Sequence, residues 1–145
     1  MFMTLGDILR QKSTEIYMTS PTETVSNAAS AMADKGIGAL LVIEDKQLRG
    51  IVTERDIVNK LLKNHLPPDT TRVSEIMTTQ LIFAHPSTTI ASAMATFTQH
   101  RFRHLPVIEN HALLGMVSIG DVTKWLLNNQ QEEISYLTDY IRTAG

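Results

Sequence analysis

The feature that most constrains this chain is an internal duplication. When the sequence is shifted by 65 residues, residues 21–62 align with residues 86–127 without a gap, and 13 of the 42 paired positions are identical. Self-similarity over such a length indicates one supersecondary unit that has been copied. In a chain of 145 residues, neither copy can bury a sizeable core alone, so we expect the copies to pack together about a pseudo-two-fold axis.

Each copy has the residue pattern of a strand, a helix, two strands and a second helix. Short β-prone runs end at Pro21 and Pro86, and proline cannot continue a strand ladder. Apolar residues then follow at helical spacing, at Val25, Ala28, Ala29 and Met32 in the first copy and at Ile90, Ala93, Met94 and Phe97 in the second. The sequence therefore predicts a mixed α/β fold of the α+β type, built from two β-α-β-β-α repeats.

Local signals indicate where these elements begin and end. Thr24 and Thr89 stand at the expected N-cap positions, where a hydroxyl can accept a hydrogen bond from the first helical turn. The first helix should end near Lys35 and Gly36. Polar turns between the paired strands are expected at Asp45-Lys46 and Asn110-His111, and closing helices over residues 54–63 and 120–128.

These boundaries divide the chain into four parts. We expect a first repeat over residues 5–64, a connector over 65–72, a second repeat over 73–128 and a helical tail over 129–145. The connector contains Pro67 and Pro68, which prevent the preceding helix from continuing. The tail has one apolar helical face, formed by Ile134, Leu137, Tyr140 and Ile141.

The composition argues against several classes of function. A net charge of -2 with 43% hydrophobic and 19% charged residues is typical of a soluble globular protein and supplies no positive field for nucleic acid. There is no cysteine, which fits a reducing cytoplasm and removes thiolate metal sites and thiol nucleophiles. No segment reaches the roughly 20 apolar residues that span a bilayer. We therefore expect a cytoplasmic protein that contacts neither membranes nor nucleic acid.

The same short phrase closes both copies. GIVTERD begins at Gly50 and GMVSIGD begins at Gly115, so that Thr53 precedes Asp56, and Ser118 precedes Asp121, by three residues. This spacing is that of a capping box, in which the hydroxyl and the acidic side chain satisfy the first backbone N–H groups of a helix. A purely structural interpretation is therefore open, with each glycine forming the tight turn between two strands.

The paired phrases, the β-α-β-β-α order and the strand LPVIE before the turn together resemble the cystathionine-β-synthase (CBS) domain pair, also called a Bateman module. The resemblance covers about residues 5–128. It implies that an adenosine-containing ligand, such as AMP, ADP, ATP, NAD or S-adenosylmethionine, binds in the cleft between the repeats. It also implies a homodimer formed through the helices.

The resemblance assigns candidate ligand contacts to matching positions. An ionised aspartate at a helix start can accept two hydrogen bonds from a ribose diol, which makes Thr53, Asp56, Ser118 and Asp121 the ribose candidates. The family's adenine contacts come from backbone around the first strand of each copy, here at Glu15, Ile16, Tyr17, Thr79, Gln80 and Leu81.

The two copies differ in the charge that they offer to a phosphate. Arg103 and His104 stand just before the central strand of the second copy, where the first copy has Gly38 and Ala39. Arg55 could add a donor in the first copy, and we expect one well-occupied site rather than two equal ones. The copies also differ in the segment that leads into the first strand, called the lead-in below. It is LGDILRQKSTEIYM in the first copy and VSEIMTTQLIF in the second, and is three residues longer in the first.

No metal is expected, because His100 and His104 bring neither a cysteine nor an evident carboxylate partner.

These observations favour a stand-alone regulatory module over an enzyme. Catalysis of hydrolysis or phosphoryl transfer would need an activated nucleophile or a carboxylate cluster for Mg²⁺, but the acidic residues are scattered except for Glu132 and Glu133 on the tail, and there is no glycine-rich phosphate loop. We expect an adenine nucleotide, AMP or ATP first, to change the conformation or oligomeric state that a regulated protein recognises. The alternatives are a ligand-free dimerisation module and a sensor of S-adenosylmethionine.

Overall fold

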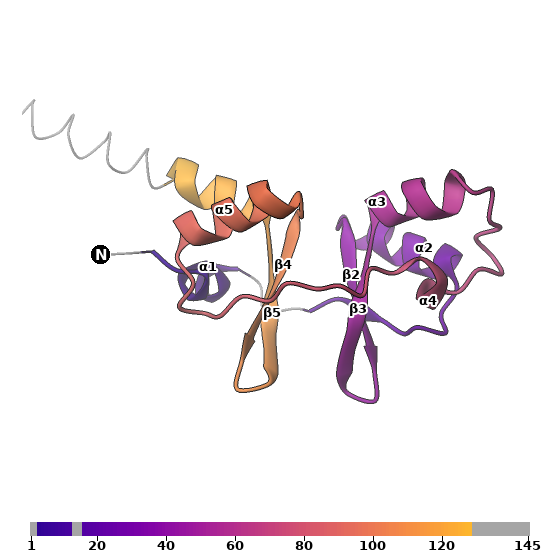
Figure 1. Cartoon of the computed structure of the whole chain (residues 1–145), viewed down its shortest axis with the longest axis horizontal. Helices are drawn as coiled ribbons and strands as arrows, with labels where there is room; N and C mark the ends of the chain where they lie inside the picture. Colours follow the sequence, from indigo (N-terminus) through magenta and orange to yellow (C-terminus); the bar gives the residue numbers. More distant parts are fainter. Residues whose placement is uncertain (1–2, 13–15, 129–145) are drawn as a thin grey trace, which may run out of the picture. The chain divides into compact units, whose positions relative to one another are not determined.

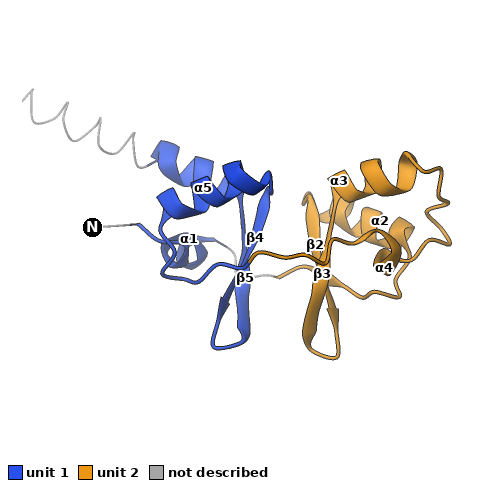
Figure 2. Cartoon of the chain, in the orientation of Figure 1, with its two compact units in different colours: residues 1–14, 83–145 blue, residues 15–82 orange. Residues whose placement is uncertain are grey.

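The computed structural model describes residues 3–12 and 16–128, and these divide between two compact units (Figure 2). Of the described residues, unit 1 contains 3–12 and 83–128, and unit 2 contains 16–82. The segment that precedes the first copy thus belongs to the unit of the second copy. The expected tail helix over 129–145 and the candidate residue Glu15 lie outside the described residues.

Unit 2 is built on a three-stranded sheet in the order β1-β2-β3. β1 runs parallel to β2, and β2 pairs with β3 in antiparallel register from Ala39 opposite Thr53 to Glu44 opposite Gln47. The elements are β1 Met18–Thr19, α2 Val25–Lys35, β2 Ala39–Glu44, β3 Gln47–Thr53, α3 Glu54–Asp56, η1 Ile57–Leu62 and α4 Val73–Ile76. In Figure 1, α2 and α3 lie at the end of the β2–β3 hairpin away from its turn.

Unit 1 repeats this arrangement around a two-stranded hairpin, in which β4 and β5 pair from His104 opposite Ser118 to Glu109 opposite Ala112. Its elements are α1 Leu5–Gln11, α5 Ile90–His100, β4 His104–Glu109 and β5 Ala112–Ser118. Residues 119–128 are helical and, with α5, lie at the end of the hairpin away from its turn (Figure 1).

The predicted caps and turns are confirmed. The Thr24 and Thr89 hydroxyls accept hydrogen bonds from the backbone N–H groups of the third residues of α2 and α5. The first helix ends at Gly36, whose φ of 65° lies in the left-handed region that glycine adopts at low cost. Both hairpin turns have positive φ at their two central residues, as a two-residue type I′ turn requires, at Asp45, Lys46, Asn110 and His111.

The apolar helical stripes form the cores. Three of the four predicted residues in each stripe are buried, and Ala29 and Met94 are partly buried. In unit 2 the stripe of α2 packs against strand residues and against α4. The buried members of that cluster are Val25, Ala28, Met32, Leu40, Val42, Val52, Leu61, Val73 and Ile76.

The lead-in segments pack by the same backbone scheme in both units. In unit 1 the Leu5 N–H donates to Thr88 O at 2.9 Å and the Ile90 N–H donates to Met3 O at 3.0 Å. In unit 2 the Val73 N–H donates to Glu23 O at 2.8 Å, and the Val25 N–H donates to Thr71 O at 2.9 Å. Each lead-in thereby satisfies backbone groups at the start of the long helix of its unit.

The first strand of the second copy is shorter than predicted. In unit 2 the Leu41 N–H donates to Tyr17 O at 3.1 Å and helps to hold β1. The residue that corresponds to Leu41 in the second copy is Pro106, which has no N–H to donate. The strand is consequently reduced to a single bridge between Ala84 and Val107.

Two further predictions are wrong in detail. The closing helix of the first copy is not one regular helix over residues 54–63, because α3 is followed by the π-helix η1, in which the Lys63 N–H donates to Val58 O. Gly50 and Gly115 do not form turns, since they lie inside β3 and β5. A Cβ at Gly50 would approach Thr78 O to 2.6 Å, so close passage of another segment excludes any side chain there.

Candidate functional site

The first candidate aspartate, Asp56, is buried and fully hydrogen-bonded. Its Oδ2 accepts from the backbone N–H and the hydroxyl of Thr53, at 3.0 and 3.1 Å. Its Oδ1 accepts from the Thr78 hydroxyl at 3.0 Å and lies 3.0 Å from the Lys60 ammonium. Four donors use the lone pairs that a carboxylate offers, and the side chain is only 7% exposed. Asp56 is therefore closed to a further ligand in this structure.

The second candidate aspartate, Asp121, is open by comparison. Its Oδ2 accepts from the Ser118 backbone N–H at 2.8 Å and from the Lys12 ammonium at 2.7 Å. No hydrogen bond from a described residue reaches its Oδ1, and the side chain is 25% exposed. The Ser118 hydroxyl accepts from the Asp121 N–H at 3.0 Å, and its side-chain hydrogen bond adds to the lowering of the Asp121 pKa. Among the described residues, therefore, one carboxylate oxygen of Asp121 has no hydrogen-bond donor.

Asp121 is held in its ionised form by its neighbours. Burial raises the pKa of the carboxyl, but the hydrogen bond and charge of Lys12 and the N–H of Ser118 lower it by more. The pKa consequently lies below the ordinary value of 3.8. An ionised carboxylate is the form that accepts hydrogen bonds from a diol.

The candidate phosphate contacts Arg103 and His104 lie at the start of β4, next to the end of β5 that carries Ser118. His104 lies directly opposite Ser118 in the β4–β5 ladder, and the carbonyl of Arg103 accepts from the Ile119 N–H at 2.9 Å. The Arg103 side chain is exposed and makes no ion pair or hydrogen bond with the described residues. Positive charge therefore lies beside the helix start that carries Asp121.

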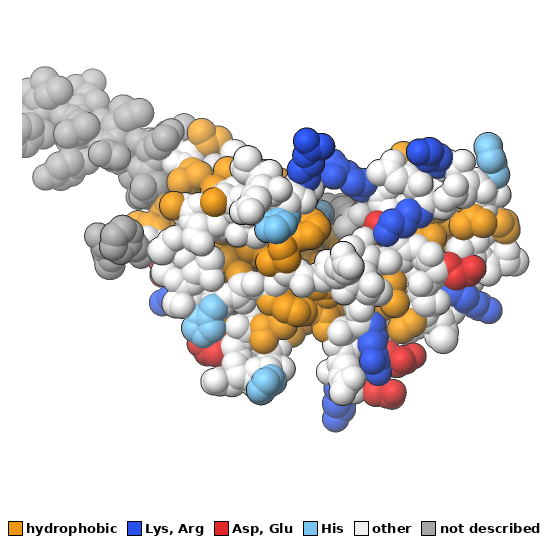
Figure 3. All heavy atoms as spheres, in the orientation of Figure 1, with side chains coloured by type: hydrophobic (Ala, Val, Ile, Leu, Met, Phe, Trp, Pro, Cys, Tyr) orange, Lys and Arg blue, Asp and Glu red, His pale blue; other side chains and the backbone are white. Residues whose placement is uncertain are grey.

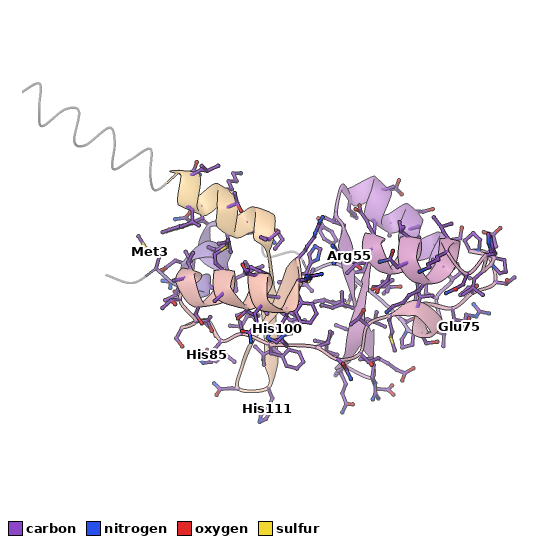
Figure 4. All side chains as sticks on the ribbon, turned by 45° about the horizontal axis from the view of Figure 1, so that its top comes forward. Met3, Arg55, Glu75, His85, His100 and His111 are labelled. Carbon is purple, nitrogen blue, oxygen red and sulfur yellow. The ribbon has the colours of Figure 1, made fainter. Side chains whose placement is uncertain are left out.

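The corresponding position in unit 2, Gly38, has no charged side chain and lies near the carboxylate of Glu54. The Glu54 N–H donates to Gly38 O at 3.0 Å, and a Cβ at Gly38 would lie 3.6 to 3.8 Å from the Glu54 carboxylate. Arg55 projects from the start of α3 (Figure 4), so unit 2 offers one arginine and one glutamate. The two helix starts thus differ in electrostatics as well as in the state of their aspartates.

The candidate adenine contacts also differ in their backbone bonding. The carbonyl of Tyr17 is occupied by the Leu41 N–H, and the Lys35 ammonium lies 5.3 Å from the centre of the Tyr17 ring. Ile16 lies in irregular backbone before β1. Thr79, Gln80 and Leu81 follow Thr78 without regular secondary structure, and their backbone groups make no hydrogen bond with the described residues. This stretch can offer backbone donors and acceptors to a planar base.

Sequence reasoning missed the partners of both aspartates. Lys60 could have been found, because it stands four residues after Asp56 on a predicted helix and such pairs lie on one face. Lys12 could not, since it is separated from Asp121 by 109 residues and reaches it only through the packing of α1 in unit 1. Thr78 gave no signal beyond its position in the lead-in.

Several solved structures are similar to this chain. A CBS-domain protein of Burkholderia ambifaria MC40-6 is 41% identical, with a TM-score of 0.85 over 88% of this chain and 96% of that one. A hexameric CBS-CP12 protein of bloom-forming cyanobacteria is 30% identical, with a TM-score of 0.75 over 85% of this chain and 71% of that one. Oligomeric assembly is thus represented among the relatives.

The expectation that no metal is involved is contradicted by another relative. Hypoxic Response Protein I, solved with two coordinated zinc ions, is 30% identical to this chain, with a TM-score of 0.70 over 83% of this chain and 97% of that one. The sequence argument considered only side chains within one chain segment, which does not exclude metal sites of other kinds. Within residues 3–12 and 16–128, no three His, Asp or Glu side chains gather in a metal-binding group.

The match to known proteins extends over both copies. The mitochondrial CBS domain-containing protein CBSX3 of Arabidopsis thaliana is 35% identical over 149 aligned residues, which cover 96% of this chain and 72% of the relative. The model of the CBS domain matches residues 4–63 and again residues 73–128. No described helix is long and apolar enough to cross a bilayer. This chain therefore belongs to the CBS-domain family, as a tandem CBS-domain protein of the regulatory kind.

Proposed function

We propose that this protein is a non-enzymatic regulatory module that binds an adenosine-containing ligand through the ribose at Asp121. The observation that carries the proposal is an ionised carboxylate at a helix start whose Oδ1 accepts no hydrogen bond from a described residue, with Lys12 bound to its Oδ2 and the exposed residue Arg103 bonded through its backbone to the same helix start. A ribose diol donates two hydrogen bonds, and a carboxylate that retains unused acceptor sites is the matching partner.

The remaining contacts follow from the chemistry around Asp121. The Ser118 hydroxyl, which lies beside the Asp121 carboxylate, can turn to donate to a ribose or phosphate oxygen. Arg103 and His104 supply the donors for a phosphate. AMP, ADP, ATP and NAD all satisfy this pattern, and S-adenosylmethionine shares only the adenosine part. The adenine contact with backbone at Thr79, Gln80 and Leu81 stays a prediction.

The position at Asp56 should be the weaker one. A ribose there would have to displace the Lys60 ammonium or the Thr78 hydroxyl from a buried carboxylate, and displacing partners that the ligand does not fully replace lowers affinity. Asp56 and Thr53 then act chiefly as a helix cap, and Arg55 as a secondary phosphate contact.

We further propose that the protein signals through a change in its own association, as a homodimer in the cytoplasm that a regulated protein recognises. Exposed apolar side chains support such contacts (Figure 3). Val58 and Leu62 lie one turn apart in sequence and are 55% and 57% exposed, and Leu127, which corresponds to Leu62 in the second copy, is 56% exposed. Large exposed apolar side chains at matching positions are typical of interaction surfaces.

The proposal is tested by isothermal titration calorimetry of the purified protein, first freed of bound nucleotide, against AMP, ATP, NAD and S-adenosylmethionine. At least one of the first three should bind with a dissociation constant below about 100 μM, which corresponds to a binding free energy of roughly 5.5 kcal/mol. Asp121→Asn should weaken this binding by at least tenfold, because hydrogen bonds to a charged group contribute about 1.5–3 kcal/mol.

Asp7→Asn is the matched control. Asp7 closes a third capping box, with Thr4 at the start of α1 in the same unit, but it is no ligand candidate. Its replacement should leave affinity unchanged. If folded wild-type protein binds none of the four ligands, or if Asp121→Asn binds as tightly as wild type, the proposal is refuted and the ligand-free dimerisation module becomes the better description.

A further inference from the structure

Lys12 is the least expected neighbour of the proposed ligand site. It lies at the C-cap of α1, in the lead-in that is three residues longer in the first copy. Its ammonium donates to Asp121 Oδ2 at 2.7 Å and to Met116 O at 2.9 Å. One of its three N–H groups has no acceptor among the described residues, and the side chain is 36% exposed.

The two copies neutralise their aspartates by different routes. In unit 2 the cation is Lys60, which stands on the same helix as Asp56 and also donates to Ile76 O and to the Thr78 hydroxyl. The corresponding position in the second copy is Trp125, and the charge comes instead from a distant segment. Lys60 thus has three acceptors, whereas among the described residues one N–H of Lys12 has no acceptor and Oδ1 of Asp121 has no donor.

We propose that Lys12 is a specificity-determining residue, which makes the Asp121 site prefer adenosine ligands with a 5′-phosphate over those with a neutral or cationic 5′ group. This inference rests on the proposed function, because it requires a ribose at Asp121. When the diol binds Asp121, it competes with the ammonium for the carboxylate. A long, flexible lysine side chain can then turn to an anionic oxygen one sugar ring away, and its charge is not left unpaired.

The charge of the ligand decides what this displacement costs. With AMP, the phosphate replaces the carboxylate as the partner of Lys12. With adenosine, the ammonium loses part of its ion pair and gains only water. With S-adenosylmethionine, the sulfonium at the 5′ position is repelled by Lys12 and by Arg103. The structure therefore predicts that the affinities fall in the order AMP, adenosine, S-adenosylmethionine.

The first experiment measures the ratio of AMP to adenosine affinity by calorimetry in wild type, Lys12→Gln, Lys12→Arg and Lys60→Gln. Lys12→Gln should lower this ratio by about tenfold, as expected for the loss of one charge-assisted hydrogen bond. Lys12→Arg should keep most of the preference, since the charge remains. Lys60→Gln is the matched control and should leave the ratio unchanged, although it removes the same charge from the other aspartate.

The second experiment uses unaltered protein and so does not depend on the folding of any variant. Reductive methylation of lysines, followed by mass spectrometry, reports how exposed each ammonium is. Adenosine should raise the reactivity of Lys12 by releasing it from Asp121, and AMP should lower it. Lys60 serves as the internal reference and should respond to neither ligand.

The outcomes separate this inference from the function on which it rests. If wild-type protein binds neither AMP nor adenosine, the proposed function fails and this inference fails with it. If both bind but Lys12→Gln keeps the wild-type ratio, or adenosine and AMP change the reactivity of Lys12 alike, only the role of Lys12 is overturned.

Discussion

The contrast between the two aspartates predicts that the same substitution has unequal costs. Asp56→Asn and Asp121→Asn each replace a carboxylate that closes a capping box by an amide of similar size. At Asp56 the amide meets four donors in a buried position, and it cannot accept from all of them because one of its heavy atoms is itself a donor. At Asp121 two donors are affected, and the surroundings are partly open to water.

The magnitudes follow from burial. Removing one partner of a buried ion pair costs about 3–5 kcal/mol. Because the Lys60 side chain is 44% exposed and the Asp56 side chain 7% exposed, we expect the lower end, about 3 kcal/mol. Lys12 and Asp121 are 36% and 25% exposed, and a solvent-accessible pair contributes at most about 1 kcal/mol. Asp121→Asn should therefore cost about 1 kcal/mol, since its amide oxygen can still cap the helix.

The assay is urea unfolding without ligand, followed by far-ultraviolet circular dichroism. Amide hydrogen exchange at Val52 and Val117, which are buried in the strands of unit 2 and unit 1, reports which unit loses stability. Asp56→Asn should accelerate exchange at Val52 more than Asp121→Asn accelerates it at Val117. Equal losses, or a larger loss for Asp121→Asn, would refute the distinction between a closed and an open carboxylate.

Three further predictions concern local features. Gly50→Ala should destabilise the protein by about 2 kcal/mol in thermal melts, because its Cβ would meet Thr78 O, a backbone atom, at 2.6 Å; a change below about 0.5 kcal/mol would contradict the close approach. Thr89→Ala should cost about 1 kcal/mol in urea unfolding through loss of the bond from the Ser92 N–H, and Thr89→Ser should restore it. The pKa of Asp121 is lowered on folding, so its ionised form adds stability above the unfolded pKa near 3.8, and this contribution is lost as pH falls through the lower folded value. The difference in stability between wild type and Asp121→Asn should accordingly shrink below about pH 4 in acid titrations, and a difference independent of pH would speak against the lowered pKa.

Much of the fold follows from local rules that the sequence displays directly. Helix spacing, the N-cap of Thr24 and the turn at Asp45 and Lys46 each depend on residues within one or two turns of each other, and each is confirmed. The duplication then carries these features from one copy to the other. This is why the element order of both repeats could be predicted from a single sequence.

The errors arise where distant segments meet. The strand at Ala84 is short because Pro106, some twenty residues later, lacks the N–H that would hold it. The backbone of Thr78 leaves no room for a side chain at position 50, and Lys12 forms the ion pair with Asp121. None of these contacts leaves a periodic signal, since each depends on which lead-in packs in which unit. The site residues could thus be placed on the correct strand ends, but their electrostatic partners could not.

The exchange of lead-in segments has a consequence for the order in which the protein can fold during synthesis. Unit 2 is continuous in the chain, and its contact from Arg72 to Thr22 spans 50 residues. Unit 1 needs contacts such as that from Lys12 to Asp121, which span 109 residues. Each doubling of a loop costs only about 0.6 kcal/mol in closure entropy, so the difference is one of timing rather than of stability.

Since domains fold as units while the chain emerges from the ribosome, unit 2 can be complete before most of unit 1 has been translated. The helix α1 is made before unit 2, yet its apolar residues Leu5 and Ile8, which are buried in the finished protein, find their partners only when the second copy appears. Although α1 precedes unit 2 in the chain, it is therefore packed into the protein after unit 2. A nascent chain arrested after unit 2 should expose α1 to chaperones and proteases while its sheet is already protected.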